Sequence, residues 1–269
     1  MSSDMSTSRY FYGNPNNDFD DYQQAMQTFS LHESLNSAKT SSLPLAQFWR
    51  PNGLEDRINH IRGQKADEVR WALREPAKRC FEYPTSLPKN CGKGKPSMTD
   101  LMLLSDSYKI AIEAKYTEYL ESGLEYRPHV GDWRKDNPQN RAKVLSGWLN
   151  LVGARIECDT SILDDIPYQL IHRIASACSN VVQEKPIVIY HLFYDNDSYQ
   201  SAYHFAEKLK KWATDLKLNG IGFHVLLTKI VLSPIASKYE DENKLNLIFK
   251  HIRTKNFYGN LMETELISL

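Results

Sequence analysis

The segment from Asp100 to Lys115 constrains the fold of this chain more than any other. Residues 100–104 (DLMLL) are apolar after their first position, and residues 109–115 (KIAIEAK) alternate between apolar and other side chains. The intervening Ser105-Asp-Ser-Tyr108 has the composition of a turn, because Ser and Asp side chains hydrogen-bond their own backbone there. We therefore expect residues 99–115 to form an antiparallel hairpin in the middle of a mixed sheet, with Ile110 and Ile112 buried.

The elements predicted around this hairpin alternate between helices and strands. Helical spacing of apolar residues predicts helices at 63–73, 139–152, 167–178 and 198–216. Further strands are predicted at 79–83, 185–194 and 223–232. Loops are predicted at 84–96 and 118–138, and a helix followed by an irregular tail is predicted from residue 240. This alternation is typical of an α/β protein with a central mixed β-sheet flanked by helices.

Composition favours one large domain preceded by a polar arm. The chain has 269 residues, of which 41% are hydrophobic, and this is enough for a substantial core. Residues 1–42 are rich in Ser, Asn, Asp and Gln, so we expect a flexible N-terminal arm followed by a domain at 43–269. Lys plus Arg and Asp plus Glu both total 33, and this balance argues against a protein that coats polyanions along its whole surface.

The chain carries no sequence signal for a membrane or for secretion. No stretch reaches the roughly 18 apolar residues that a membrane helix needs, and residues 1–9 lack the apolar core of a signal peptide. The four cysteines form no CxxC pair and no zinc-site spacing with His. We expect a cytoplasmic protein with reduced thiols and no membrane partner.

Charged residues interrupt the predicted hairpin at positions that bring them together. Residues two apart in a strand point the same way, so Glu113 and Lys115 share a face, and Asp100 begins the partner strand beside them. A hard divalent cation such as Mg²⁺ relieves the repulsion between two such carboxylates, and a neighbouring Lys can orient water or stabilise developing phosphorane charge. These residues predict a phosphodiester-cleaving centre. The alternative is a surface salt bridge between Glu113 and Lys115 or Lys109.

The order Thr99-Asp100, then Glu113-Ala114-Lys115, resembles the PD-(D/E)xK signature of the restriction-endonuclease-like phosphodiesterases. The resemblance covers residues 63–195, where the predicted order of helix, three strands, helix and strand is similar to the core of that superfamily. Thr99 stands where the motif often has Pro. Two further triplets of the [D/E]xK type, at 215–217 and 242–244, have no strand Asp a hairpin away.

The resemblance implies a metal-dependent deoxyribonuclease with a restriction-endonuclease-like core. The expected reaction is Mg²⁺-dependent hydrolysis of DNA, with Mn²⁺ as a substitute, by an endonuclease of restriction, phage-defence or repair type. Asp100, Glu113 and the carbonyl of Ala114 are the implied metal ligands, and Lys115 is the implied catalytic Lys. The competing class is a non-catalytic nucleic-acid-binding or assembly module that retains the fold, and RNA is the alternative substrate.

Two helices are expected to contribute further catalytic residues. In the resembling superfamily an acidic residue on the helix before the first strand often joins the metal site, which points to Glu68, with Glu82 as a weaker rival. A Gln on the helix after the motif approaches the site in several branches, which points to Gln169. His172 lies three residues further on and shares its helix face. The alternatives are an exposed Glu, an exposed Gln and a His in an ordinary polar contact.

Basic loops flank the motif on both sides and suit phosphate contacts, which supply most non-specific nucleic-acid affinity. The candidate nucleic-acid-binding residues are Lys93, Lys95, Arg134, Lys135 and Arg141. For each of them the alternative is ordinary solvated charge. Double-strand cutting generally needs two active sites, so a homodimer is the expected assembly, with a subunit of a larger defence or repair complex as the alternative.

Overall fold

The hairpin expected at residues 99–115 lies in the middle of a mixed β-sheet. Its strands are β5 (Ser97–Leu104) and β6 (Tyr108–Lys115), which pair antiparallel with Leu101 opposite Ile112. Ile110 and Ile112 are both buried. The hairpin prediction and the α/β class are therefore confirmed.

The computed structural model describes residues 10–12, 14–19, 41–50, 53–75, 77–119, 128–232, 261 and 263–269. These residues form a nine-stranded sheet in the order β2-β1-β4-β5-β6-β7-β8-β9-β3. The strands besides the hairpin are β1 (Tyr10–Tyr12), β2 (Asn14–Phe19), β3 (Ile61–Arg62), β4 (Lys78–Thr85), β7 (Lys185–Tyr194), β8 (Gly222–Lys229) and β9 (Thr264–Ser268). Strands β6, β7 and β8 run parallel, whereas β5 runs antiparallel to both of its neighbours, β4 and β6.

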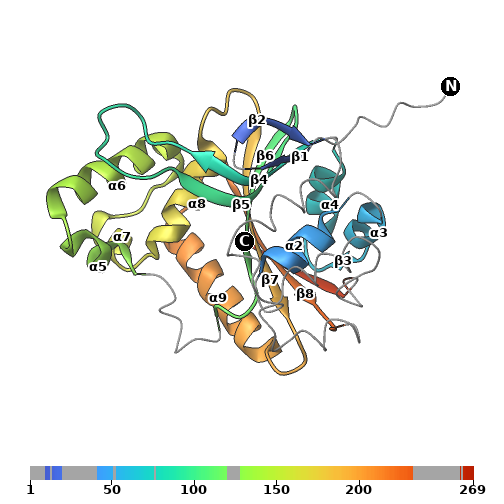
Figure 1. Cartoon of the computed structure of the whole chain (residues 1–269). Helices are drawn as coiled ribbons and strands as arrows, with labels where there is room; N and C mark the ends of the chain where they lie inside the picture. Colours follow the sequence, from blue (N-terminus) through green and yellow to red (C-terminus); the bar gives the residue numbers. More distant parts are fainter. Residues whose placement is uncertain are drawn as a thin grey trace, which may run out of the picture.

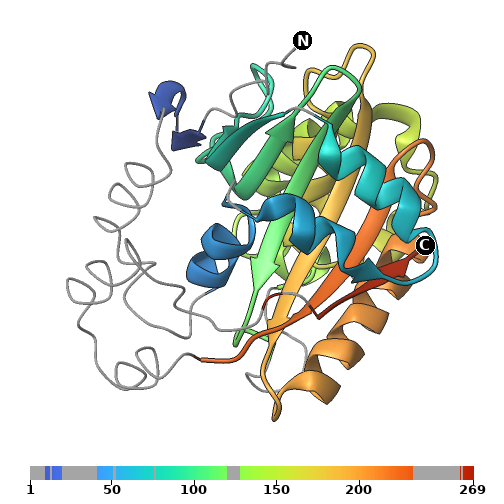
Figure 2. The ribbon, with the colours of Figure 1, turned by 90° about the vertical axis from the view of Figure 1, so that its right-hand side faces the viewer.

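Two layers of helices cover the two faces of the sheet (Figures 1 and 2). One layer consists of α2 (Ser42–Phe48), α3 (Leu54–Asn59) and α4 (Ala66–Arg74). The other consists of α5 (Val130–Lys135), α6 (Pro138–Val152), the 3₁₀ turn η2 (Gly153–Arg155), α7 (Thr160–Asp164), α8 (Tyr168–Cys178) and α9 (Tyr199–Asp215). The second layer holds the crossovers that parallel strands require, since α5–α8 connect β6 to β7 and α9 connects β7 to β8.

Strand parity decides which residues of β6 face which helical layer. Ile110, Ile112 and Ala114 pack into the apolar cluster under α2–α4, and Ala111 packs into the cluster under α6, α8 and α9. Glu113 alternates with the first set, so its side chain points toward α8. The sheet therefore has one apolar face at this strand and one face that carries charge.

Local sequence explains how α6 is placed beside the hairpin. Pro138 occupies the first turn and the Asn137 side chain accepts a hydrogen bond from the N–H of Asn140, which is a favourable helix start. Gly147 allows the loop before β5 to approach, because a Cβ there would lie 2.6 Å from the Cβ of Cys91. The Lys-rich loop is thereby held against α6.

Two of the predictions from sequence are wrong. The loop expected at 118–138 contains α5, a helix of six residues that is too short to show helical periodicity. The irregular tail expected at the C-terminus contains β9, which pairs antiparallel with β8 and buries Leu266. Pairing over that sequence distance is a tertiary effect that local propensity does not report. The helix expected from residue 240 lies outside the described residues.

The expected arm contributes β1 and β2 to one edge of the sheet, where β1 pairs parallel with β4. The rest of residues 1–40 lies outside the described residues, so the flexibility of the arm remains a prediction. None of the helices in the described ranges is long and apolar enough to cross a bilayer. All four cysteines are free thiols.

Candidate active site

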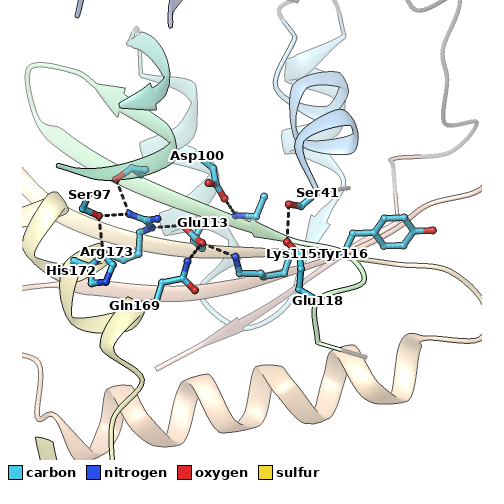
Figure 3. A network of polar contacts seen from close by, with 12 residues as sticks. Ser41, Ser97, Asp100, Glu113, Lys115, Tyr116, Glu118, Gln169, His172 and Arg173 are labelled. Atoms are coloured by element: carbon cyan, nitrogen blue, oxygen red, sulfur yellow. Dashed lines mark hydrogen bonds and ion pairs between the residues drawn. The ribbon is translucent and has the colours of Figure 1, made fainter. Parts of the chain in front are cut away.

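Asp100 lies where the two strands of the hairpin separate. The β5–β6 ladder ends at Leu101 and Ile112, and beyond it the Asp100 carboxylate accepts a hydrogen bond from the Ala114 N–H at 2.7 Å. The side chain thus replaces the main-chain partner that Ala114 loses as the strands part. In the view of Figure 3, Asp100 lies above Glu113, which belongs to β6.

Glu113 is a buried carboxylate held by three donors (Figure 3). Lys115 Nζ donates to Oε1 at 2.7 Å, the Gln169 amide donates to the same oxygen, and Arg173 Nε donates to Oε2. Burial alone would raise the pKa of Glu113, but Arg173 and Lys115 outweigh burial and lower this pKa to about 2. Glu113 is therefore ionised at neutral pH.

Arg173 is the site residue that the sequence analysis missed. Its guanidinium is buried in α8 and also donates to the hydroxyls of Ser97 at 2.9 Å and Thr99 at 3.4 Å. One sequence signal points to it: a cation stands between Ile171 and Ile174 on the apolar side of an amphipathic helix. A charge at such a position needs a buried partner.

A third carboxylate, Glu82 on β4, lies opposite Asp100. The β4–β5 register pairs Phe81 with Leu101 and then continues at Tyr83, so the ladder skips Glu82. The φ of Glu82 is 48°, in the left-handed region that residues other than Gly rarely adopt within a strand. Backbone strain of this kind is concentrated at functional sites.

The three carboxylates crowd one another electrostatically. Burial, followed by the charges of Asp100 and Glu113, raises the pKa of Glu82 to about 8. Burial and then Glu113 raise the pKa of Asp100 to about 7. With Glu113 ionised, Glu82 and Asp100 therefore stay protonated to a higher pH than an ordinary Glu or Asp does.

This arrangement fits a hard divalent cation. Asp100 and Glu82 supply two carboxylates, and the Ala114 carbonyl points toward the same gap as its N–H, because both groups of one residue face the same side of a strand. Mg²⁺ binds through one or two carboxylates and completes its shell with waters and phosphate oxygens. Among the described residues no set of three or more His, Cys, Asp or Glu side chains is placed to hold an ion alone. Such an ion would therefore depend on the carbonyl and on water.

The structure does not bring Glu68 to this centre, which corrects its expected placement. Glu68 lies on α4, over the opposite face of the sheet, and pairs with Lys185 at 2.9 Å. Lys185 lies beside Tyr108 in the sheet, whereas Glu113 lies beside Tyr190, five residues further along. The acidic residue that the fold brings to Asp100 is Glu82, the weaker rival.

Gln169 is brought to Glu113, as expected, and His172 lies one layer further out. The His172 ring contacts the Ser97 hydroxyl at 2.8 Å, and Ser97 also accepts from Arg173. His172 therefore joins the network through Ser97, as the dashed lines in Figure 3 show.

The five basic residues that were expected to contact nucleic acid divide into two groups. Lys93 and Lys95 are exposed on the loop before β5, and Asn140 of α6 fixes that loop through the backbone N–H and carbonyl of Lys93. Three others each pair with a nearby carboxylate, which partly neutralises them. These pairs are Arg134–Asp164, Lys135–Asp132 and Arg141–Asp136.

Comparison with known proteins identifies a family whose function is unknown. The family model described as "Domain of unknown function (DUF6946)" matches residues 15–234. No curated protein and no solved structure matches the chain.

Proposed function

The chain belongs to the DUF6946 family of domains of unknown function, and we propose that it is a metal-dependent nuclease acting on DNA. One observation carries the proposal: Asp100, Glu113 and Lys115 meet where the hairpin opens, and Lys115 lies 2.7 Å from Glu113. This set of carboxylates and ammonium is the one that the resemblance to PD-(D/E)xK enzymes requires.

The element order supports a restriction-endonuclease-like core. A helix (α4) precedes three antiparallel strands (β4, β5, β6), and a long helix (α8) then leads into the parallel strand β7. The resemblance implies this order of helix, three strands, helix and strand. Helix α8 also supplies Gln169 from the position that the resemblance implies.

Mg²⁺ or Mn²⁺ would be held by Asp100, Glu82 and the Ala114 carbonyl. Glu113 can add an oxygen, because an ionised carboxylate has about four lone-pair sites and three donors from the described part of the chain engage it. When bound, such an ion polarises the phosphate and lowers the pKa of its water.

Lys115 and Arg173 have different roles in this proposal. Lys115 is the catalytic residue, because its ammonium is fixed by Glu113 at the open end of the hairpin and can stabilise charge that develops on phosphorus. Arg173 is a positioning residue that holds Glu113 against α8 through its second oxygen.

A plasmid-nicking assay with Mg²⁺ or with EDTA tests the proposal. Lys115→Ala should lower the cleavage rate by about 10²–10³, the usual cost of removing one group that stabilises charge in the transition state. DNA affinity should change little, because one phosphate contact is a small part of polyanion binding. Lys115→Arg should not restore the rate, because a planar guanidinium differs in shape from an ammonium.

Lys185→Ala is the matched control, since Lys185 also pairs with a Glu, but this Glu lies on α4, over the opposite face of the sheet from α8. It should cut at the parental rate. A folded Lys115→Ala protein that nicks plasmid as fast as the parent would falsify the catalytic assignment. Single- and double-stranded DNA and RNA substrates in the same assay identify the substrate.

One observation favours the alternative of a non-catalytic nucleic-acid-binding module. Both oxygens of Glu113 already accept hydrogen bonds, and Arg173 neutralises this carboxylate in a buried pair. A parent protein that binds DNA and cuts none of the substrates with either metal would establish that alternative.

A further inference from the structure

A pocket of about 390 Å³ lies beside the candidate active site. Its apolar lining comes from two sides of the fold: Pro96 and Met98 belong to β5 and the loop before it, and Pro128, Trp133 and Tyr168 belong to the α5 and α8 region. A volume near the lower end of the roughly 300–1,000 Å³ range of ligand pockets suits one small flat group.

The aromatic wall of the pocket is fixed by its own contacts. Trp133 and Tyr168 stack with their ring centroids 3.7 Å apart and their planes 12° apart. The Tyr168 hydroxyl accepts a hydrogen bond from Trp148 Nε1 at 2.8 Å, and the Tyr168 ring contacts His172. A wall that is rigid before binding loses little side-chain entropy when a ligand arrives.

The polar lining connects the pocket to the candidate active site. Gln169 and Arg173 line the pocket and also donate to Glu113. Ser97 and His172 complete the polar lining and contact each other at 2.8 Å. An occupant would therefore meet hydroxyl, amide, imidazole and guanidinium groups, which can both donate and accept hydrogen bonds.

We propose that this pocket takes one unpaired base of the nucleic-acid substrate, next to the phosphate that is cut. The inference rests on the proposed function and narrows the substrate to single-stranded nucleic acid, or to duplex with a base turned out of its stack. A base inside a duplex is not available to a pocket of this size, whereas unstacked bases are bound against aromatic side chains and read along their edges. Lys93 and Lys95, which precede Pro96 on the same loop, are exposed for contacts with the adjoining backbone.

Binding of a labelled oligonucleotide without metal tests this assignment separately from cleavage. Fluorescence anisotropy in EDTA should show tighter binding to a single strand than to the matching duplex. Trp133→Ala, which removes part of the wall, and Met98→Trp, which fills the pocket, should each weaken single-strand binding by about tenfold to a hundredfold, the range of base–aromatic contacts. Met98 is 37% exposed, so the larger side chain can be accommodated during folding.

Trp71→Ala is the matched control. Trp71 lies on α4, over the other face of the sheet, and is 60% exposed, so its removal tests the loss of an aromatic surface residue alone. It should bind the single strand as the parent does. Equal losses in Trp71→Ala and Trp133→Ala, or parental binding by Met98→Trp, would contradict the pocket assignment.

An abasic scan distinguishes direct contact with a base from a structural effect of the variants. Oligonucleotides that lack one base at each position in turn should reveal one position where the parent loses affinity, and Met98→Trp should show no further loss at that position. Additive losses, or equal affinity for the duplex, would overturn the proposal. DNA and RNA strands in parallel identify the nucleotide. If the parent passes these tests and yet cuts nothing with Mg²⁺ or Mn²⁺, the pocket stands and the proposed function fails.

Discussion

Two Glu–Lys pairs in this chain have the same chemistry in opposite surroundings. Glu113–Lys115 and Glu68–Lys185 have similar N–O distances, 2.7 and 2.9 Å. The side chains of the first pair are 1% and 5% exposed, and those of the second are 53% and 47% exposed. The first lies under α8 and the second lies at the surface beside α4.

The difference between the two pairs shows the free-energy cost of burying a charge. Water solvates both members of the exposed pair, and such pairs contribute about 0–1 kcal/mol. Each buried ion loses several kcal/mol of hydration, and a single partner restores this only with good geometry. Glu113 therefore has Gln169 and Arg173 as additional donors. Strongly shifted pKa values of buried charged groups cluster at functional sites, and structural ion-pair networks also produce them.

The largest expected effect follows from removing the buried carboxylate. Glu113→Ala leaves the Arg173 guanidinium and the Lys115 ammonium buried without their shared partner, and this should lower the free energy of unfolding by about 3–5 kcal/mol. Urea denaturation at neutral pH measures the loss. If the alanine variant does not fold, Glu113→Gln keeps a hydrogen-bonding side chain and should fold with a smaller loss. A cost below about 1 kcal/mol would mean that this pair behaves like an exposed one.

Local signals explain why the hairpin and three of its charged residues can be predicted from sequence. Apolar alternation at 109–115 fixes the strand, and parity then places Glu113 beside Lys115. Arg173 and Glu82 are harder to assign, because each depends on a tertiary partner or on a strained backbone angle. Glu68 cannot be placed from its helix alone, since sequence does not reveal which face of the sheet α4 covers.

A smaller effect is expected from the pH dependence of Asp100. Its pKa is raised to about 7, above the value near 4 of an unfolded Asp, so the folded state holds the proton more tightly. The stability that this gives is complete below about pH 4 and is lost as the pH rises through 7. Asp100→Asn should therefore be more stable than the parent at pH 8 without metal, because an amide does not ionise and its oxygen can still accept from Ala114. Urea titrations at pH 5 and pH 8 measure the change.

The pKa of Glu113 is shifted in the opposite direction, so its contribution to stability has the opposite pH dependence. Its pKa is lowered to about 2, so its contribution to stability is present above about pH 4.5 and is lost as the pH falls toward 2.

Mg²⁺ should stabilise the parent at pH 8 and not Asp100→Asn, since ligand binding to the folded state raises its stability. Equal stabilisation of both proteins by Mg²⁺ would remove Asp100 from the proposed metal site.

The smallest expected effect belongs to the exposed pair. Lys185 lowers the pKa of Glu68 by its hydrogen bond and its charge, but water screens both side chains. Glu68→Ala should therefore change the free energy of unfolding by less than about 1 kcal/mol, and this small difference should shrink further at high salt.

The Mn²⁺ affinity of Glu68→Ala, measured by calorimetry, should equal that of the parent. Glu82→Ala should instead weaken Mn²⁺ binding, because Glu82 lies opposite Asp100. If Glu68→Ala weakened Mn²⁺ binding more than Glu82→Ala did, the third carboxylate of the site would be Glu68 after all, and α4 would have to move to the other face of the sheet when metal binds.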